Sequence, residues 1–408
     1  MNCGLLGGKL GHSYSPQIHS YFGDYSYDLF EKAPNELEDF LKHGDFAGLN
    51  VTIPYKKDVI PYCDALSPVA KQLGAVNTIV RRQDGTLIGH NSDLFGFSSM
   101  VKRSGIAVSG KKVLILGSGG ASNTAVFALK EMGANVVVIS RSGENHYNNL
   151  HRHADASVII NTTPVGMYPH VGVSPVSLTH FPMLEGVLDV IYNPGKTQLL
   201  LDAEKLGIPC FNGLWMLVAQ AVESAQWFTG KPISESLIPV IYRKLQQQME
   251  NIVLIGMPGC GKSTIGMQLA QALNKRFVDA DTCIEAAAGC TIPEIFANGG
   301  EDAFRRLESQ VLENLGKCSG TVIATGGGCV TRPENYPYLH QNGTIIWIKR
   351  ELSLLATDGR PLSQNGHLEQ MYHTRQPLYQ AFADITVENS SSVIDTVNNI
   401  CHHLEAQI

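Results

Sequence analysis

The chain has 408 residues, which at about 100 to 200 residues per domain predicts two to four domains and excludes a single small fold. Apolar residues make up 44% and charged residues 17% of the chain, which is typical of a globular protein and excludes a disordered, collagen-like or membrane-spanning chain. The formal net charge is −6 and no long basic block occurs, so we expect no nucleic acid partner.

The cysteines and the N-terminal segment predict a cytoplasmic protein. Nine cysteines, an odd number, are irregularly spaced and form no CxxC pair, which favours a reducing compartment. The segment MNCGLLGGKLGHSYSP lacks the basic and apolar stretches of a signal peptide, and no apolar run approaches the ~20 residues that span a bilayer. We therefore expect no membrane partner, while no residue pattern indicates the oligomeric state.

In chain order, three domains are predicted. Residues 1–103 alternate short apolar runs with turn residues, and a new strand begins at 111–117 after a boundary near 104–110. Strand-like runs then recur with spacers long enough for helices, which is the rhythm of a parallel sheet. The runs are VLIL, NVVVIS, ASVIIN and VLDVIY. A helical pattern at 212–228 ends this second domain, 104–240, and is expected to return to the first; the third domain, 241–408, begins with a helix-prone connector and the strand NIVLIG.

The strongest motif is GMPGCGKST (256–264), which satisfies GxxxxGK(S/T) between an apolar strand and a helical pattern. Its glycines let backbone N–H groups face phosphate oxygens at a helix N-terminus, Lys262 would reach the β- and γ-phosphates, and Ser263 is placed to ligate Mg²⁺. The alternative is a glycine-rich turn without a ligand. The predicted ATP contacts are Gly259, Cys260, Gly261, Lys262, Ser263 and Thr264.

Several segments downstream of this motif, taken together with it, resemble a known family. FVDADTCIE, IPEIFANGGEDAFRRLE, ATGGGCV, GRPL and HTRQPLY follow in order, and with the phosphate loop they resemble shikimate kinase over about residues 250–405. The resemblance implies Mg²⁺ binding by Asp279, a catalytic role for Asp281 at the acceptor hydroxyl, and stabilisation of the transferred phosphoryl group by Arg360. It further implies substrate binding by Asp281, Arg305, Gly326, Gly327, Gly328 and Arg375. One departure is a short lid segment, ELSLLATDGRPL, without the upstream arginine that stacks on adenine in many relatives.

A glycine turn follows the strand KVLIL in the second domain. GSGGAS departs from the common GxGxxG spacing and is weak evidence alone, but the next strand ends at Ser140 and Arg141, where an NAD-binding fold would carry an acidic residue. A basic residue there favours the 2′-phosphate of NADPH, although Arg141 could equally be a surface residue.

Five further segments resemble shikimate dehydrogenase over about residues 1–240. They are GHSYSPQIHS (11–20), GLNVTIPYKK (48–57), GAVNT (74–78), GHNSD (89–93) and GLWMLVAQA (213–221). The resemblance implies substrate binding by Ser13, Ser15, Thr52, Asn77, Asp93, Tyr192 and Gln220, and NADPH binding by Gly117, Ser118, Gly119, Gly120, Ala121, Ser140, Arg141, Val190 and Gly213.

The same resemblance implies that Lys56 and Asp93 are the catalytic pair. Reduction of a ring ketone requires a hydride on one face and a proton for the developing alkoxide, and a lysine oriented by a carboxylate can supply that proton. Taken without the surrounding motifs, Lys56 would sit in an exposed charged turn and Asp93 would cap a helix.

The combined resemblance implies an α/β protein with an N-terminal α/β substrate domain, a doubly wound NADP-binding Rossmann-like domain and a P-loop kinase α/β domain. The implied function is NADPH-dependent reduction of 3-dehydroshikimate followed by ATP- and Mg²⁺-dependent phosphorylation of shikimate. The alternatives are a small-molecule-responsive regulator that keeps both folds without turnover, and an enzyme with quinate or NAD specificity in its first half.

Overall fold

The computed structural model describes residues 1–11, 13–23, 25–355 and 368–406. These residues form two compact units. Unit 1 comprises Met1–Val165, Ser174–Tyr192 and Asp202–Lys244, and unit 2 comprises Gly166–Val173, Asn193–Leu201 and the chain from Leu245 onward.

The first sheet of unit 1 has the strand order β2-β1-β3-β5-β6-β4. Its strands are β1 (Asn2–Gly7), β2 (Ser26–Glu31), β3 (Gly48–Val51), β4 (Ala65–Leu66), β5 (Thr78–Arg81) and β6 (Leu87–His90). The helices around them are α1 (Ser15–His19), α2 (Leu37–His43), α3 (Pro68–Leu73) and α4 (Asp93–Ser104).

Strand direction in this sheet gathers the predicted site residues at one edge. β1 and β3 are parallel and both end there, while β5 is antiparallel to β3 and begins there, with Thr78 opposite Asn50. β6 runs back to the same edge, with His90 opposite Thr78. The loops after β1, β3 and β6 and the residue before β5 therefore converge, although they are far apart in sequence.

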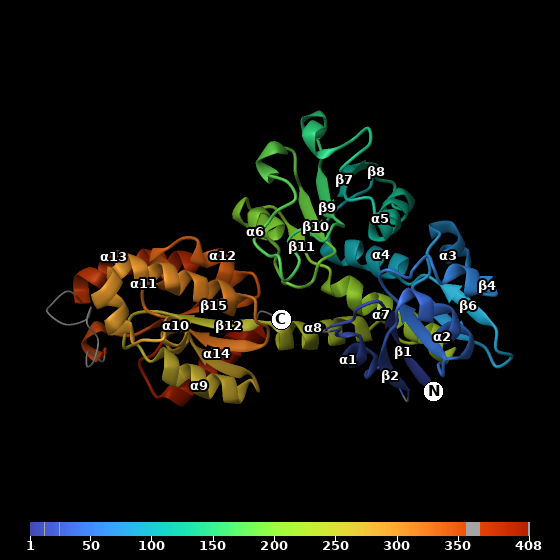
Figure 1. Ribbon diagram of the computed structural model, residues 1–408. Helices are drawn as coiled ribbons and strands as arrows, with labels where there is room; N and C mark the ends of the chain where they lie inside the picture. The colour runs from blue at the N-terminus through green and yellow to red at the C-terminus, as the bar shows by residue number, and fades with distance from the viewer. Residues whose placement is uncertain (12, 24, 356–367, 407–408) are drawn as a thin grey trace. The chain divides into compact units, whose positions relative to one another are not determined.

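The second sheet of unit 1 is all parallel, with the order β11-β10-β9-β7-β8. Its strands are β7 (Lys112–Leu116), β8 (Asn135–Ile139), β9 (Val158–Asn161), β10 (Gly186–Asp189) and β11 (Cys210–Phe211). The helices are α5 (Gly120–Glu131), which packs on β7 and β8, α6 (Gln198–Lys205) and α7 (Leu214–Thr229), which packs on α4 and β3 of the first sheet (Figure 1). The helix predicted at 212–228 is therefore confirmed.

Two connections in this sheet differ from the predicted helix-length spacers. The chain between β8 and β9 forms only the 3₁₀ segment η3 (Tyr147–His153), and the chain between β9 and β10 only η4 (Leu178–His180). Four prolines between residues 164 and 182 explain the second case, because proline removes a backbone donor and clashes with the preceding turn of an α-helix.

Unit 2 is built on a parallel sheet with the order β13-β14-β12-β15-β16. Its strands are β12 (Asn251–Ile255), β13 (Arg276–Asp279), β14 (Thr321–Ala324), β15 (Gly343–Lys349) and β16 (Ile385–Glu388). The helices are α9 (Lys262–Ala272), α10 (Ala280–Ala288), α11 (Ile292–Gly316), α12 (Asn335–His340), α13 (Leu368–Phe382) and α14 (Val393–Ala406). Figure 1 shows α11, α12 and α13 on one face of the sheet and α9 and α14 on the other.

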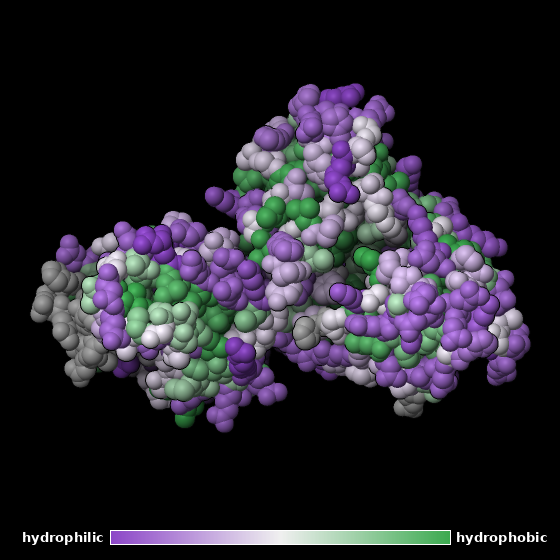
Figure 2. Space-filling model, viewed as in Figure 1, coloured by the Kyte–Doolittle hydropathy of each residue, from purple (hydrophilic) through white to green (hydrophobic). Residues whose placement is uncertain are grey.

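The boundary between the units falls within α8 (Leu237–Met249), the helix-prone connector of the sequence. The central strands are almost fully buried, as expected for parallel sheets covered on both faces. On the face seen in Figure 2 the outer surface of each unit is mostly hydrophilic, and apolar residues show in its recessed parts. Among the described residues, no helix combines the length and apolar character needed to cross a membrane.

Candidate functional site

Lys56 and Asp93 form an ion pair at the converging edge of the first sheet. Nζ of Lys56 lies 2.6 Å from Oδ2 of Asp93, with side-chain exposures of 29% and 14%, so both charges are partly withdrawn from water. Asp93 is the first residue of α4, and its N–H donates to Oδ1 of Asn91 at 3.0 Å. The pair is thus held by a helix start and is not an exposed charged turn.

Ser92 connects the predicted substrate residues Asn77 and Gln220. Its N–H donates to Oδ1 of Asn77 at 2.7 Å, Nδ2 of Asn77 donates to the Ser92 hydroxyl at 3.1 Å, and that hydroxyl donates to Oε1 of Gln220 at 3.3 Å. Ser92 is fully buried. It fixes two amides, whose ordinary ligands are hydroxyl and carboxylate oxygens, beside the ion pair. Sequence reasoning missed Ser92, although it lies within the segment GHNSD.

The predicted carboxylate-binding serines follow β1 at the same edge. The N–H of Ser15 donates to Oγ of Ser13 at 3.2 Å, and the ring of the intervening Tyr14 meets that of Tyr192 edge-on at 6.3 Å. Tyr192 is thereby placed beside the serines despite its distance in sequence. Thr52 follows β3, and its N–H donates to the carbonyl of Leu6 at 2.9 Å.

The glycine turn after β7 has a backbone conformation that leaves room for a phosphate group to approach closely. Gly117 has φ of +110°, and a Cβ there would lie 3.0 Å from Oγ1 of Thr162, so a larger residue would be strained and crowded. Gly119 and Gly120 have open space where their side chains would be. Ser118 and Ala121 belong to the same turn, which leads into α5.

The remaining predicted NADPH residues lie at the ends of other strands. Ser140 and Arg141 follow β8; the Ser140 hydroxyl donates to the carbonyl of Ser142, and Arg141 is exposed. Val190 follows β10, and its carbonyl lies so close to Gly213 that any Cβ at position 213 would overlap it. All are therefore near the carboxyl ends of parallel strands or the helices that follow, where dinucleotides bind in such sheets.

A second candidate site is a cavity of about 580 Å³ in unit 2. It lies between the loop after β12, the loop after β14 and the start of α10. The predicted kinase residues that line it are Gly259, Gly261, Lys262, Ser263, Thr264, Asp279, Asp281, Arg305, Gly326, Gly327, Gly328 and Arg375. Cys260 lies in the same loop but is fully buried.

The phosphate loop is preformed around Lys262. Gly261 has φ of +98° and precedes α9, and Nζ of Lys262 donates to the carbonyls of Gly256 and Met257 at 2.9 and 3.0 Å. The hydroxyl of Ser263 donates to Oδ2 of Asp279 at 2.6 Å. A hydroxyl and a carboxylate beside a phosphate loop are the oxygen ligands that Mg²⁺ takes when phosphate and water complete its shell. The residues present therefore fit a magnesium ion, although the described residues contain no cluster of three acidic, histidine or cysteine side chains.

Asp281 faces Glu308 across the glycine loop. Asp281 Oδ1 and Glu308 Oε1 are buried without hydrogen-bond partners among the described residues, and they lie 3.0 and 2.7 Å from where a Cβ would stand on Gly326. Burial, reinforced by the nearby Asp279 carboxylate, raises the pKa of Asp281 above its ordinary value. Burial likewise raises the pKa of Glu308, against the opposing effect of Arg305. A carboxyl with a raised pKa next to a phosphate loop is suited to accept a proton from an acceptor hydroxyl.

Arg305 and Arg375, the two arginines predicted to bind the substrate, are hydrogen-bonded to other residues of the protein. Nη1 of Arg305 donates to Oε2 of Glu308 at 2.6 Å, and its Nε and Nη2 donate to Oε1 of Glu301. A Cβ on Gly328 would overlap the Arg305 guanidinium, so glycine is needed for this approach. Nη1 of Arg375 donates to the carbonyl of Gly327 at 3.1 Å, and one turn later Tyr379 donates its hydroxyl to the same carbonyl.

Sequence reasoning missed Glu308 and Tyr379, although FRRLE and RQPLY contain them. Arg360 and most of the short lid segment lie outside the described residues.

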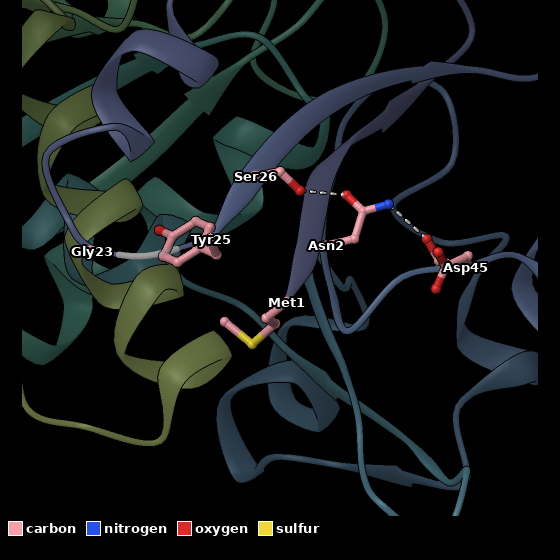
Figure 3. A pocket seen from close by; sticks show the side chains of 6 residues that line it. All are labelled: Met1, Asn2, Gly23, Tyr25, Ser26 and Asp45. Atoms are coloured by element: carbon pink, nitrogen blue, oxygen red, sulfur yellow. Dashed lines mark hydrogen bonds between the residues drawn. The ribbon is translucent and has the colours of Figure 1, made fainter.

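Another hollow lies at the opposite end of the first sheet, where β1 and β2 begin (Figure 3). There the Ser26 hydroxyl donates to Oδ1 of Asn2 at 3.0 Å, and Nδ2 of Asn2 donates to the carbonyl of Asp45 at 2.9 Å. The hollow contains none of the predicted site residues, and its amide side chain is already bonded within the protein.

Two regions of the chain match models of known families. The model of the shikimate dehydrogenase substrate binding domain matches residues 5–79, and the shikimate kinase model matches residues 258–405. A shikimate dehydrogenase (NADP(+)) of Clostridium perfringens is 35% identical over 265 residues, which cover 60% of this chain and 97% of that protein.

Solved structures of shikimate dehydrogenases are similar to 60% of the chain. Shikimate dehydrogenase 1 from Peptoclostridium difficile has 38% identity and a TM-score of 0.56, with 60% of this chain and 97% of that chain covered. The enzyme from Thermus thermophilus, solved with NADP(H) and shikimate, has 30% identity and a TM-score of 0.55, with 60% and 99% covered. The fold class predicted from the sequence is confirmed.

Proposed function

Since the chain belongs to the shikimate dehydrogenase family and carries a shikimate kinase domain, it is a bifunctional shikimate-pathway enzyme, and we propose that it reduces 3-dehydroshikimate to shikimate with NADPH and then phosphorylates shikimate with ATP. The observation that carries the proposal is that each unit contains a group of interacting polar residues suited to one of the two reactions: the Lys56–Asp93 pair in unit 1, and Lys262, Ser263 and Asp279 at the phosphate loop in unit 2.

In the dehydrogenase site, bound NADPH supplies a hydride to the carbonyl carbon of the substrate. Lys56 gives a proton from its ammonium group to the carbonyl oxygen, and the resulting neutral amine takes a proton from water. Asp93 keeps the ammonium oriented and accepts a hydrogen bond from the same hydroxyl. The proposed carboxylate contacts are Ser13 and Ser15, and the proposed ring and carboxyl contacts are Thr52, Asn77, Tyr192 and Gln220.

The cofactor residues proposed for this site are the glycine turn 117–121, Ser140, Arg141, Val190 and Gly213. The exposed Arg141 guanidinium at the end of β8 supports NADPH, because a bidentate cation suits a 2′-phosphate better than a ribose hydroxyl.

In the kinase site, the acceptor hydroxyl attacks the γ-phosphorus of ATP, the bond to the β-phosphate oxygen breaks, ADP leaves, and Asp281 takes the hydroxyl proton. Lys262 leaves its backbone carbonyls for the phosphates, and we propose Ser263 and Asp279 as Mg²⁺ ligands. The proposed shikimate contacts are Asp281, Arg305, Arg375 and the glycines at 326–328, while Arg360 is retained from the sequence as a charge-stabilising residue.

We also retain the three-domain division as a proposal: residues 1–103 for substrate, 104–240 for NADPH and 241–408 for phosphoryl transfer. The presence of one sheet in each of these ranges supports it. A cytoplasmic location and the absence of nucleic acid or membrane partners likewise remain proposals from composition.

The test is a coupled assay with 3-dehydroshikimate, NADPH, ATP and magnesium, which follows NADPH absorbance and quantifies shikimate 3-phosphate by mass. Lys56→Ala should abolish reduction and leave phosphorylation of added shikimate unchanged, while Lys262→Ala should do the reverse. Lys57→Ala, at the exposed neighbouring lysine, is the matched control and should affect neither. If either site variant abolishes both activities in a folded protein, independent sites are disproved; ligand binding without product would favour a regulator.

Similarity to one solved structure supports a second candidate function, with quinate as the substrate and NAD as the cofactor. A quinate dehydrogenase from Corynebacterium glutamicum, solved in complex with NAD, has 28% identity, a TM-score of 0.54 and 99% coverage of that chain by 60% of this one. Steady-state rates with shikimate or quinate, each with NADP⁺ or NAD⁺, separate the two functions.

A further inference from the structure

One cationic side chain in the kinase cavity has a buried nitrogen without a hydrogen-bond partner among the described residues. Four such side chains line the cavity: Lys262, Arg305, Arg350 and Arg375. Lys262 and Arg375 donate to backbone carbonyls, and Arg305 is paired with two glutamates. Nε of Arg350, by contrast, is buried without a hydrogen-bond partner among the described residues. A buried charged donor without an acceptor is costly, which suggests that its acceptor comes from a ligand.

The position of Arg350 identifies the part of the cavity it serves. It directly follows β15, whose pairing with β12 brings the end of the strand against the phosphate loop. Nη1 of Arg350 lies 3.9 Å from where a Cβ would stand on Gly261, the residue immediately before α9. The guanidinium is therefore beside the N-terminus of α9, where the helix dipole and free N–H groups already favour an anion.

The loop that faces Arg350 is itself braced. Nδ2 of Asn389, the residue after β16, donates to the carbonyl of Cys260 at 2.8 Å. The acceptor side of the cavity is different: Arg305 approaches Gly328, and Arg375 binds the carbonyl of Gly327. Arg350 thus stands at the phosphate-loop side, away from the residues proposed for the carboxylate of shikimate.

We propose that Arg350 binds the non-transferred phosphates of the nucleotide, an assignment that rests on the kinase function proposed above. Its planar fork can donate two hydrogen bonds to phosphate oxygens at α9, which satisfies the orphaned donor and adds a positive charge to the polyphosphate site. Arg350, which follows β15 and lies outside the short lid segment, thereby contributes to nucleotide affinity.

The test is calorimetric binding of ADP and of adenosine to the full chain and its variants. Arg350→Gln should weaken ADP binding about tenfold, as expected for loss of a charge-assisted hydrogen bond, while leaving adenosine binding unchanged. Arg350→Lys should restore part of the affinity, and the salt dependence of ADP binding should be shallower in Arg350→Gln than in wild type. Arg332→Gln is the matched control, because Arg332 is in the same unit but pairs with Asp302 and Glu334 and does not line the cavity.

Three other results would each overturn the assignment of Arg350. If Arg350→Gln binds ADP within about twofold of wild type, the assignment is wrong, and the kinase proposal stands as long as wild type binds ADP and forms product. Equal losses for ADP and adenosine would show that the side chain acts on the base and would overturn the phosphate assignment. If wild type itself binds no ADP, the kinase proposal fails, and the role of Arg350 fails with it.

Discussion

The buried ion pair between Arg305 and Glu308 provides a stability prediction that can be worked from the structure. The Arg305 side chain is 6% exposed and the Glu308 side chain is fully buried, with Nη1 and Oε2 2.6 Å apart. Glu308→Ala removes the buried counter-charge and leaves Arg305 with only Glu301, which is 54% exposed. The variant therefore leaves a guanidinium buried beside a new cavity.

The expected cost follows from these burials. Removing one partner of a buried pair typically costs 3–5 kcal/mol, and the exposed Glu301 offsets about 1 kcal/mol of this at most. We expect about 3 kcal/mol of destabilisation in unit 2. With a urea m-value of about 2 kcal/mol/M, the unfolding midpoint should fall by about 1.5 M.

The assay is a urea titration followed by amide hydrogen exchange with mass spectrometry. Peptides from β12 and β14 report on unit 2, and peptides from β7 and β9 report on unit 1 of the same molecules. Glu301→Ala is the matched control, because it removes the exposed partner of the same arginine and should shift the midpoint by less than about 0.5 M. Glu308→Gln, which keeps the shape and loses the charge, should show more than half of the effect of Glu308→Ala.

Two results would refute this reasoning. A Glu308→Ala midpoint within about 0.3 M of wild type would show that the pair contributes no net stability. A silent Glu308→Gln beside a strongly destabilised Glu308→Ala would assign the loss to the cavity rather than to the unpaired charge.

Three further predictions concern titration and close packing. Burial lowers the pKa of His19 to about 3, so between that value and 6.5 the unfolded chain holds a proton that the folded chain lacks, and unit 1 should lose about 1.4 kcal/mol of stability per pH unit as pH falls through this window. His19→Phe should remove that component of the slope in urea titrations at pH 4 to 7. Because the pKa of Asp281 is raised, the acid limb of the kinase pH–rate profile should lie above the ordinary aspartate value of 3.8, and Asp281→Asn should remove the limb together with about 10²- to 10⁴-fold of the rate. Gly328→Ala places a methyl group against the Arg305 guanidinium and should raise the KM for shikimate about tenfold or more while the dehydrogenase rate is unchanged; an unaltered KM would contradict the close approach.

The fold class and the places of the two glycine loops could be predicted because their signals are local. The phosphate loop and the glycine turn each follow an apolar strand and precede a helix, so their position at a sheet edge follows from the sequence pattern. The spacers on either side of β9 were mispredicted because their length alone indicated helices. Four prolines explain the missing helix between β9 and β10, whereas the spacer between β8 and β9 contains no proline. Ser92 was missed because its importance depends on Gln220, 128 residues away, and only the packing of α4 on α7 brings them together.

Two arginines of the kinase cavity show why the hydrogen-bond acceptor of a charged side chain cannot be predicted from the sequence alone. As letters in the sequence, Arg305 and Arg350 are equivalent, and each would ordinarily be a solvated surface residue. The fold buries the Arg305 side chain and the Nε atom of the half-buried Arg350, and the desolvation cost then favours an acceptor for each. Arg305 finds Glu308 three residues along α11, so its positive charge is largely compensated before any substrate arrives. Arg350 follows β15, and its Nε has no acceptor in the part of the chain that the structure describes. Arg305 therefore stabilises and shapes the cavity in addition to its proposed contact with shikimate, whereas Arg350 retains an unsatisfied donor for the anion that the phosphate loop is proposed to hold.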